Sequence, residues 1–260
     1  MMQDLFSLKG RTALVTGGSR GIGRMIAAGF IEQGARVYIT SRKADVCDET
    51  AAELCSLGSC ISIPMDVSTV EGAKALAKEF AAREDKLDIL VNNAGAAWLE
   101  PFDKFSEKGW DKVVDLNLKA PFFVSQALIG PLRNAAKIRP AKIINVASID
   151  GIFVNPQETY SYAASKAGLI PLTRRMSLRL IQDNIHGNGI APGAFASDMN
   201  MLASDHADRV AARIPAKRIG YDEDMAGVAV YLASRAGDYV VGVTIAVDGG
   251  VSLTTAIFEG

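Results

Sequence analysis

Short apolar runs that alternate with longer amphipathic stretches restrict the fold of this chain more than any other feature. The runs expected as strands are Thr12–Thr16, Val37–Thr40, Ser59–Pro64, Asp88–Val91, Lys142–Ala147 and Val243–Val247. Between them, helical spacing predicts helices over Ile22–Gln33, Ala44–Leu57, Thr69–Arg83, Trp110–Leu128, Tyr162–Leu180 and Met225–Ala233. Apolar strands separated by helices indicate a parallel sheet that is covered on both faces. We therefore expect one α/β domain, residues 1–260, with a Rossmann fold and a doubly wound parallel sheet of about seven strands.

A glycine-rich turn joins the first predicted strand to the first predicted helix. Gly17, Gly21 and Gly23 form a GxxxGxG pattern there. Such glycines make the turn, let the backbone approach a pyrophosphate and let the helix pack on the strand, while the helix N-terminus offers free N–H groups to the phosphates. A tight turn without a ligand is the alternative, but the position between strand and helix favours a dinucleotide. The expected contacts come from Gly17, Ser19, Arg20, Gly21, Ile22 and Gly23.

The end of the second predicted strand indicates which dinucleotide is bound. NAD sites usually place an acid about 20 residues after the glycines, whereas an arginine suits the 2′-phosphate of NADP. Here the strand runs into Ser41 and Arg42, and no acid occurs before Asp45. Arg20 and Arg42 can bind one phosphate through forked, charge-assisted hydrogen bonds. The sequence therefore favours NADP(H) over NAD(H).

Ser148, Tyr162 and Lys166 are the candidate catalytic residues. Tyr162 and Lys166 lie one helical turn apart on a predicted helix, so their side chains share a face. A nearby cation is expected to lower the pKa of the tyrosine from about 10, which would let it act as general acid or base. Ser148 can hold a carbonyl oxygen. Tyr160 is the weaker candidate because alanine, not lysine, follows it at the same spacing.

With these motifs in order, the chain resembles the short-chain dehydrogenase/reductase family from about Leu8 to Val251, in its single-domain branch. The resemblance implies that Asn117 joins Ser148, Tyr162 and Lys166 in catalysis by holding a water that links the lysine to solvent. It also implies that Tyr162 and Lys166 contact the nicotinamide ribose. Further cofactor contacts implied by the family pattern are Asp66, Val67, Asn93, Ala94, Gly95, Pro192, Gly193 and, in place of a usual threonine, Ser197.

Two departures from the family pattern concern the site. Gly187 and Gly189 replace residues that are usually β-branched. Because glycine weakens a strand, the two glycines put the rigidity of the sixth strand, and with it the activity, in question. Asp150 is an acid where small residues are usual. We expect it to cap a turn rather than to take part in catalysis.

The substrate side is less sharply indicated. By resemblance, residues 195–214 form a lid, in which Phe195 and Met199 would contact substrate, and Trp98 and Phe153 would line the other walls together with Ser148 and Tyr162. These side chains suit an apolar or medium-sized ketone, although they are equally suited to packing the lid onto the body. A reductase similar to 3-oxoacyl-carrier-protein reductases is the first hypothesis. A sugar-acid or polyol dehydrogenase is the second, and an NADP sensor without turnover is the third.

Composition narrows the partners. A net charge of −1 gives no basic surface for nucleic acid, and no apolar run is long enough for a membrane span. Three cysteines and no evident secretory signal favour reduced thiols and a cytoplasmic location, and two histidines make a metal site improbable. The partner we expect is a small carbonyl or alcohol substrate. Family resemblance adds a homotetramer built on helices Trp110–Leu128 and Tyr162–Leu180.

Overall fold

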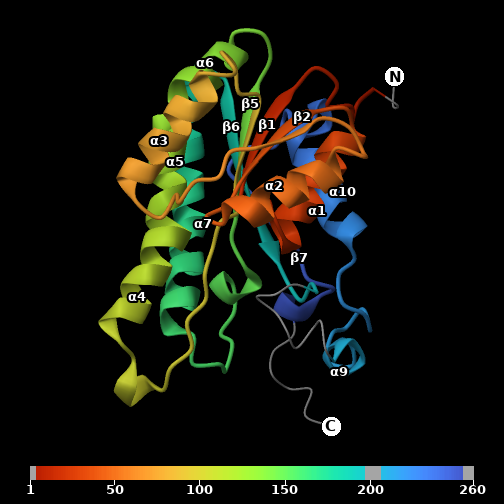
Figure 1. The fold of residues 1–260 in the computed structure, drawn as a ribbon. Helices are drawn as coiled ribbons and strands as arrows, with labels where there is room; N and C mark the ends of the chain where they lie inside the picture. Colours follow the sequence, from red (N-terminus) through yellow and green to blue (C-terminus); the bar gives the residue numbers. More distant parts are fainter. Residues whose placement is uncertain (1–3, 197–205, 254–260) are drawn as a thin grey trace.

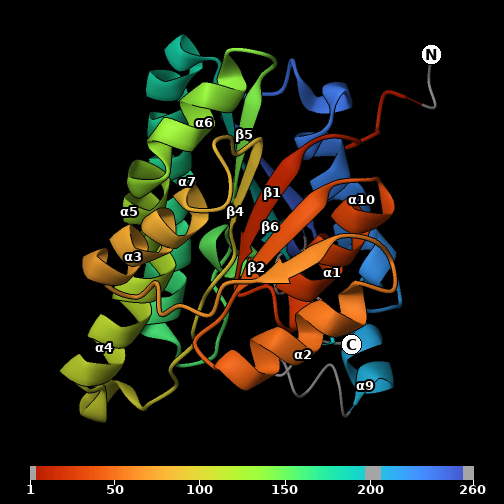
Figure 2. The same ribbon diagram turned by 45° about the horizontal axis from the view of Figure 1, so that its top comes forward.

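Seven parallel strands form one sheet in a computed structural model that describes residues 4–196 and 206–253. Their order across the sheet is β3-β2-β1-β4-β5-β6-β7. The strands are β1 (Thr12–Thr16), β2 (Arg36–Thr40), β3 (Cys60–Ser62), β4 (Ile89–Asn92), β5 (Ala141–Val146), β6 (Ile185–Pro192) and β7 (Thr244–Val247). β1 lies between β2 and β4, with Val15 paired to Ile39 and to Val91 (Figure 2). The order reverses between β1 and β4, which confirms the predicted doubly wound Rossmann fold.

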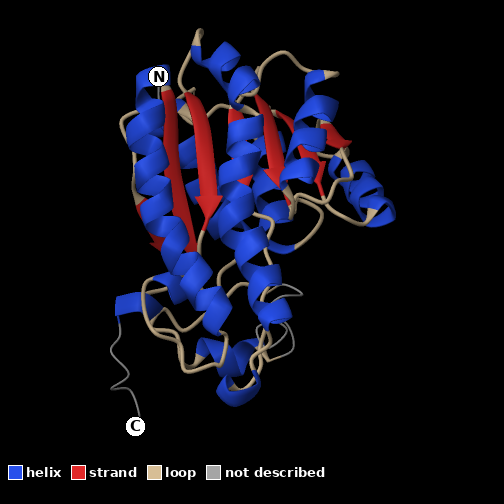
Figure 3. Ribbon diagram, turned by 90° about the vertical axis from the view of Figure 1, so that its left-hand side faces the viewer, coloured by secondary structure: helices blue, strands red, loops and turns tan. Residues whose placement is uncertain are grey.

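Helices cover both faces of this sheet (Figures 1 and 3). One face carries α1 (Gly21–Glu32), α2 (Ala44–Leu54) and α10 (Asp222–Ala233), and the other carries α3 (Val70–Ala81), α4 (Glu107–Val114), α5 (Ala120–Ala127), α6 (Ile129–Ala136) and α7 (Tyr160–Leu180). Alternate residues of a strand point to opposite faces, so Ile144 enters the α1/α10 core and Ile143 enters the α3/α5 core. A short helix, α9 (Ala207–Ala211), lies near the carboxyl ends of the strands. No helix within the described ranges is long and apolar enough to cross a membrane.

The helix predicted as continuous over Trp110–Leu128 is interrupted. After α4 the chain makes a π-helical turn, Asp115–Lys119, before α5 begins at Ala120. A π-turn inserts one residue into the helical repeat and often marks a functional position. Periodicity alone missed it because buried apolar residues occur on both sides of the turn, at Val113 in α4 and at Ala120 and Val124 in α5. The turn contains Asn117, a predicted catalytic residue.

The sixth strand forms in full despite its two glycines. β6 spans eight residues, all of them buried, between β5 and β7. A Cβ at Gly187 would lie 2.5 Å from Ser177 Oγ of α7, and one at Gly189 would lie 2.6 Å from Thr244 Oγ1 of β7. The Ser177 hydroxyl also donates to Gly187 O at 2.8 Å. The glycines therefore permit close packing of neighbours on β6, which offsets their poor intrinsic strand propensity.

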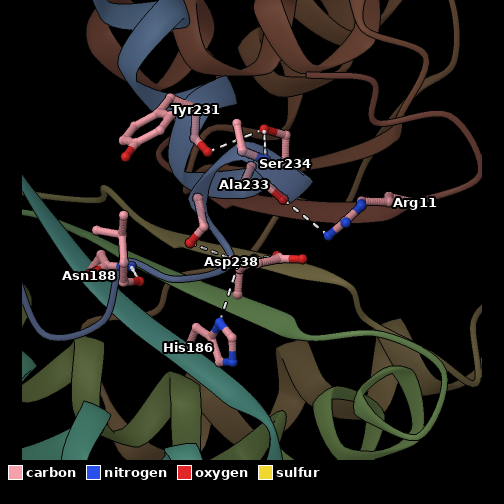
Figure 4. Close-up of polar contacts among 11 residues, drawn as sticks. Arg11, His186, Asn188, Tyr231, Ala233, Ser234 and Asp238 are labelled. Carbon is pink, nitrogen blue, oxygen red and sulfur yellow. Dashed lines mark hydrogen bonds and ion pairs between the residues drawn. The ribbon is translucent and has the colours of Figure 1, made fainter. Parts of the chain in front are cut away.

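The amino end of the sheet holds a buried polar cluster (Figure 4). Arg11 donates to Ala233 O at 3.0 Å, and Lys142 of β5 forms an ion pair of 2.7 Å with Asp238. The Lys142 side chain is only 1% exposed, whereas that of Asp238 is 32% exposed. His186 of β6 lies 3.5 Å from Lys142 Nζ through Nδ1. These contacts attach the segment after α10 to β1, β5 and β6, at the end of the sheet opposite to the glycine-rich turn.

Candidate active site

The glycine-rich turn brings β1 and α1 into close contact. Gly17 has φ of +65°, and a Cβ there would lie 2.9 Å from Ala94 Cα. A Cβ at Gly23 would run into the carbonyl oxygen of Gly17. No side chain caps the N-terminus of α1, whose N-cap is Arg20, and Gly21 and Ile22 form its first turn. Free N–H groups at a helix N-terminus bind anions, so this glycine-lined turn fits the pyrophosphate of a dinucleotide.

Asn93 holds this turn in place. Its side-chain amide donates to Thr16 O at 2.9 Å and to Gly17 O at 3.1 Å. In return, Thr16 Oγ1 accepts from the backbone N–H groups of Asn93 and Ala94, at 2.9 and 3.0 Å. Asn93 is thus a positioning residue for the glycine turn. Ser19 is fixed similarly, since its carbonyl accepts from Thr50 Oγ1 at 3.0 Å.

The adenosine side of the predicted site has the polarity expected for a phosphate. Arg42 is exposed after β2, and among the described residues its guanidinium has no hydrogen-bond or ion-pair partner. Ser41 Oγ donates to Lys43 O at 3.2 Å. Asp66 is exposed and its carboxyl accepts from Ser68 N at 2.9 Å, while Val67 is buried. A 2′-phosphate therefore has a cation available at Arg42 and meets no acid at the end of β2.

The four predicted catalytic residues come from three elements. Ser148 follows β5, Tyr162 and Lys166 lie in the first two turns of α7, and Asn117 lies in the π-turn. The Ser148 hydroxyl lies close enough to the Tyr162 phenol to lower the pKa of that phenol. Asn117 accepts from Ala96 N at 2.8 Å and donates to Ala96 O at 2.9 Å and to Ser165 Oγ at 3.2 Å. It therefore joins the loop after β4 to α7.

The expected lowering of the pKa of Tyr162 by Lys166 is not found in the structure. Lys166 Nζ donates to Val146 O at 2.7 Å and lies 5.7 Å from the centre of the Tyr162 ring. Burial raises the pKa of Tyr162 to about 12, with Ser148 lowering it and Asp150 raising it by smaller amounts. Burial also lowers the pKa of Lys166 to about 8. Tyr162 and Lys166 lie one turn apart on α7 as predicted, but the Lys166 ammonium donates its hydrogen bond to the backbone of β5.

Comparison with known proteins identifies the fold family. The family described as Enoyl-(Acyl carrier protein) reductase matches residues 17–252. A Pseudomonas aeruginosa protein named rhamnolipids biosynthesis 3-oxoacyl-[acyl-carrier-protein] reductase is 44% identical over 97% of this chain and all of its own. The chain belongs to the short-chain dehydrogenase/reductase family.

Other relatives of this short-chain dehydrogenase/reductase differ in their substrates. The Escherichia coli 5-keto-D-gluconate 5-reductase is 36% identical and covers 96% of this chain and 98% of its own. Several similar solved structures contain NADP. The Pseudomonas aeruginosa RhlG/NADP active-site complex has a TM-score of 0.93 at 43% identity, covering 96% of this chain and 99% of that one. A gluconate 5-dehydrogenase from Burkholderia cenocepacia, in complex with NADP and tartrate, has a TM-score of 0.90 at 34% identity, covering 98% and 100%.

The predicted substrate-side residues of this short-chain dehydrogenase/reductase are spread over several places. Trp98 packs on α4, where a Cβ at Gly109 would strike its indole, and Lys112 Nζ lies 4.7 Å above the ring. Phe153 is half-buried in the loop after Ser148. Ser197 and Met199 lie outside the described residues. Pro192 ends β6, and Gly193 N donates to Val247 O at 2.9 Å, which fixes the backbone that leads to Phe195.

Phe195 is buried, at 2% exposure, and packs on Gly220. It also lines a cavity of about 330 Å³ between the carboxyl ends of β6 and β7, with Ile214, Arg218 and Val247 among the other walls. Ser148 and Tyr162 do not line this cavity. The structure therefore brings the catalytic residues together but assigns Trp98 and Phe195 to packing contacts with α4 and with the β6–β7 end.

A buried polar network beneath the site was missed from the sequence. Asn92 of β4 donates to Asn145 Oδ1 of β5 at 2.8 Å and to Ser125 Oγ at 3.0 Å. Asn145 donates to Thr173 Oγ1 of α7 at 2.9 Å. The signal was available, because one asparagine interrupts each of two apolar strands. This network connects α5 and α7 to β4, which leads into the loop of Gly95, and to β5, which leads to Ser148.

Proposed function

We propose that this chain is an NADP-dependent oxidoreductase that reduces a ketone to a secondary alcohol and catalyses the reverse reaction, with Tyr162 as the acid and base. The observation that carries the proposal is the convergence of Ser148, Tyr162, Lys166 and Asn117 beside a glycine turn that fits a dinucleotide. The NADP complexes of related structures support the choice of cofactor, as does the unpartnered Arg42. NADPH supplies the hydride in reduction, and its oxidised form accepts one in the reverse direction.

The residues act on the oxygen of the substrate. The Ser148 hydroxyl donates a hydrogen bond to the carbonyl oxygen and holds it beside Tyr162. As negative charge develops on that oxygen, the Tyr162 phenol donates its proton. A pKa of about 12 keeps this phenol protonated at neutral pH, so it is already an acid for reduction. Oxidation needs the phenolate, and it therefore gains from higher pH.

Lys166 and Asn117 support this proton transfer. The Lys166 ammonium is buried, and its hydrogen bond to Val146 O holds it near the phenol and near Gly95, where a dinucleotide ribose is expected. Asn117 fixes the loop at Ala96 against α7 and so sets the distance between that loop and Lys166. Both residues orient groups that contact the reactants.

The experiment is NADPH consumption by the purified protein over a panel of ketones that includes a β-ketoacyl thioester and 5-ketogluconate. Tyr162→Phe is expected to bind NADPH normally and to lose about 10²–10⁴-fold in turnover. Tyr160→Phe is the matched control, because this exposed tyrosine has, within the described part of the chain, a hydrogen bond to Glu158 and ring contacts with Phe102 and Phe105. Full activity in Tyr162→Phe refutes the mechanism. NADPH binding with no turnover of any ketone supports the sensor alternative instead.

A sugar-acid or polyol dehydrogenase is the second candidate. The half-buried carboxyl of Asp150, next to Ser148 and Tyr162, is the observation that favours a substrate with hydroxyl groups. The ketone panel separates the two candidates by the ratio of kcat/KM for 5-ketogluconate to that for the β-ketoacyl thioester.

We also propose that the protein forms a homotetramer and is located in the cytoplasm. Large apolar side chains are exposed on the helices expected to pair, at Trp110, Phe122 and Leu178. Cys47, Cys55 and Cys60 are free thiols, which suits a reducing compartment. Light scattering on a sizing column tests the assembly, since a monomer would refute it. Fractionation of the native cell tests the location.

A further inference from the structure

Asp150 lies directly beside the candidate catalytic residues. It sits in the 3₁₀ turn Ile149–Gly151, which packs on α7 so tightly that a Cβ at Gly151 would lie 2.6 Å from the backbone carbon of Lys166. Ser148 is the N-cap of this turn, and its Oγ accepts from Asp150 N at 3.1 Å. The expected capping role therefore belongs to Ser148. The carboxyl of Asp150 is not needed to form the turn.

The half-buried carboxyl group of Asp150 has few protein partners. Only one donor reaches it among the described residues, the Asn155 side-chain nitrogen, which lies 3.3 Å from Oδ1 and 3.4 Å from Oδ2. No lysine or arginine of that part of the chain forms an ion pair with it. A carboxylate has about four acceptor positions, and a buried one that lacks donors is costly. Burial accordingly raises the pKa of Asp150. At least one strong acceptor position remains for a ligand donor.

The same carboxyl is close enough to the reacting position to act on it. Its charge raises the pKa of Tyr162, and the backbone N–H of Asp150 donates to Ser148 Oγ at 3.1 Å, so the residue lies directly beside the hydroxyl that would hold the carbonyl. A ketone oxygen held by Ser148 and Tyr162 would place the adjacent carbon of the substrate near Asp150. A hydroxyl on that carbon can donate to the carboxylate, whereas a carboxylate or a thioester carbonyl there would face a like charge or a second acceptor.

We infer that Asp150 is a specificity-determining residue that accepts a hydrogen bond from a hydroxyl on the carbon next to the reacting carbonyl, so that the substrates are α-hydroxyketones and the corresponding diols. The inference rests on the proposed function, because it uses Ser148 and Tyr162 to fix the carbonyl. It explains why an acid occupies a position where the family usually has a small residue.

The test uses hydroxyacetone and butanone, which have the same shape and differ in a hydroxyl against a methyl group. The measured quantity is the ratio of kcat/KM for hydroxyacetone to that for butanone, with NADPH. Asp150→Ala is expected to lower this ratio about 10- to 100-fold, because a hydrogen bond to a charged acceptor is lost. Asp150→Asn keeps an acceptor oxygen without the charge and should lower it less. Asp111→Ala removes an exposed carboxylate on α4 and is the control for general charge effects.

Binding separates this inference from the proposed function. In Tyr162→Phe protein loaded with NADPH, the ratio of the dissociation constants of the two ketones should change on adding Asp150→Ala by a similar factor. A wild-type protein that turns over neither ketone, but whose preference for binding hydroxyacetone requires Asp150, refutes the proposed function and supports the inference. Turnover of both ketones with an unchanged ratio in Asp150→Ala and Asp150→Asn overturns the inference. Equal losses on both ketones also overturn it, since Asp150 would then act on Tyr162 alone.

Discussion

The ion pair between Lys142 and Asp238 gives a quantitative test of the amino end of the sheet. Asp238→Ala leaves the Lys142 ammonium, which is 1% exposed, with Gly237 O at 3.3 Å as its remaining oxygen partner. A lysine in this position can release its proton. Doing so near pH 7, against an ordinary pKa of about 10.4, costs about 4.6 kcal/mol, which sets a ceiling on the loss.

The expected loss lies below that ceiling. Removing one partner of a buried ion pair typically costs about 3–5 kcal/mol, but Asp238 is 32% exposed and water can enter beside the vacated carboxyl. We therefore expect Asp238→Ala to lower the free energy of unfolding by about 2–3 kcal/mol. For a chain of this size that corresponds to a fall in Tm of about 4–12 °C. Asp238→Asn should lie between the alanine variant and wild type.

The lysine side of the pair should behave differently. Lys142→Met removes the buried charge and fills its volume, while the Asp238 side chain, which is 32% exposed, can turn its carboxyl toward water, so we expect a change within about 1 kcal/mol. In the Lys142→Met background, Asp238→Ala should cost no more than about 0.5 kcal/mol, as for a surface substitution. Urea unfolding followed by circular dichroism measures all four proteins. The reasoning is refuted if Asp238→Ala costs the same with methionine as with lysine at position 142.

Three further predictions concern the cofactor, β6 and pH. Arg42→Ala should weaken NADPH binding about 10- to 100-fold and leave NADH binding nearly unchanged, and equal losses in a fluorescence titration would remove the 2′-phosphate contact. Gly187→Ala should destabilise the protein by about 1–3 kcal/mol, because the new Cβ would lie 2.5 Å from Ser177 Oγ, and Ser177→Ala should recover part of that loss in urea unfolding. Burial, and then Lys142, lower the pKa of His186, so the unfolded chain takes up a proton below about pH 6.5 before the folded chain does. Stability is therefore lost as pH falls from about 6.5 toward the lower folded pKa, and His186→Gln should flatten this part of the unfolding profile.

The sequence predicted the fold because its strongest signals are local. The buried strands β1, β2, β4 and β5 each contain an apolar run, and the glycines at 17, 21 and 23 mark the first turn whatever the rest of the chain does. The exact course of the chain at Asn117 escaped prediction, since a π-turn adds one residue without moving the apolar faces on either side. The packing of β6 could not be predicted either. Intrinsic strand propensity includes the conformational entropy that glycine loses on folding, but it does not include the close approach of Ser177 that Gly187 permits.

In the candidate site, too, the sequence predicted the positions of residues better than the contacts of their side chains. Spacing placed Lys166 one turn from Tyr162, but it could not tell that the carbonyl of Val146 would take the ammonium's hydrogen bond. Trp98 closely follows the predicted cofactor contacts Asn93, Ala94 and Gly95. Its ring nevertheless packs on α4, because Gly109 has no side chain to exclude the indole. The role of Asn93 was predicted only as a contact with the cofactor. Its hydrogen bonds show that it also holds the glycine turn, which the sequence did not indicate.

The hydrogen bond from Arg11 to Ala233 joins residues that are 222 positions apart. At about 5–20 residues per second, a ribosome makes the second partner some 10–45 s after the first. During that interval α1 and β5 lack the contacts that α10 makes with them, and the Arg11 guanidinium lacks its acceptor. The glycine turn, by contrast, needs nothing beyond the loop at Asn93 and Ala94. A nascent chain can thus complete its nucleotide end long before its opposite end closes, so the two ends of the same central strand mature at different times during synthesis.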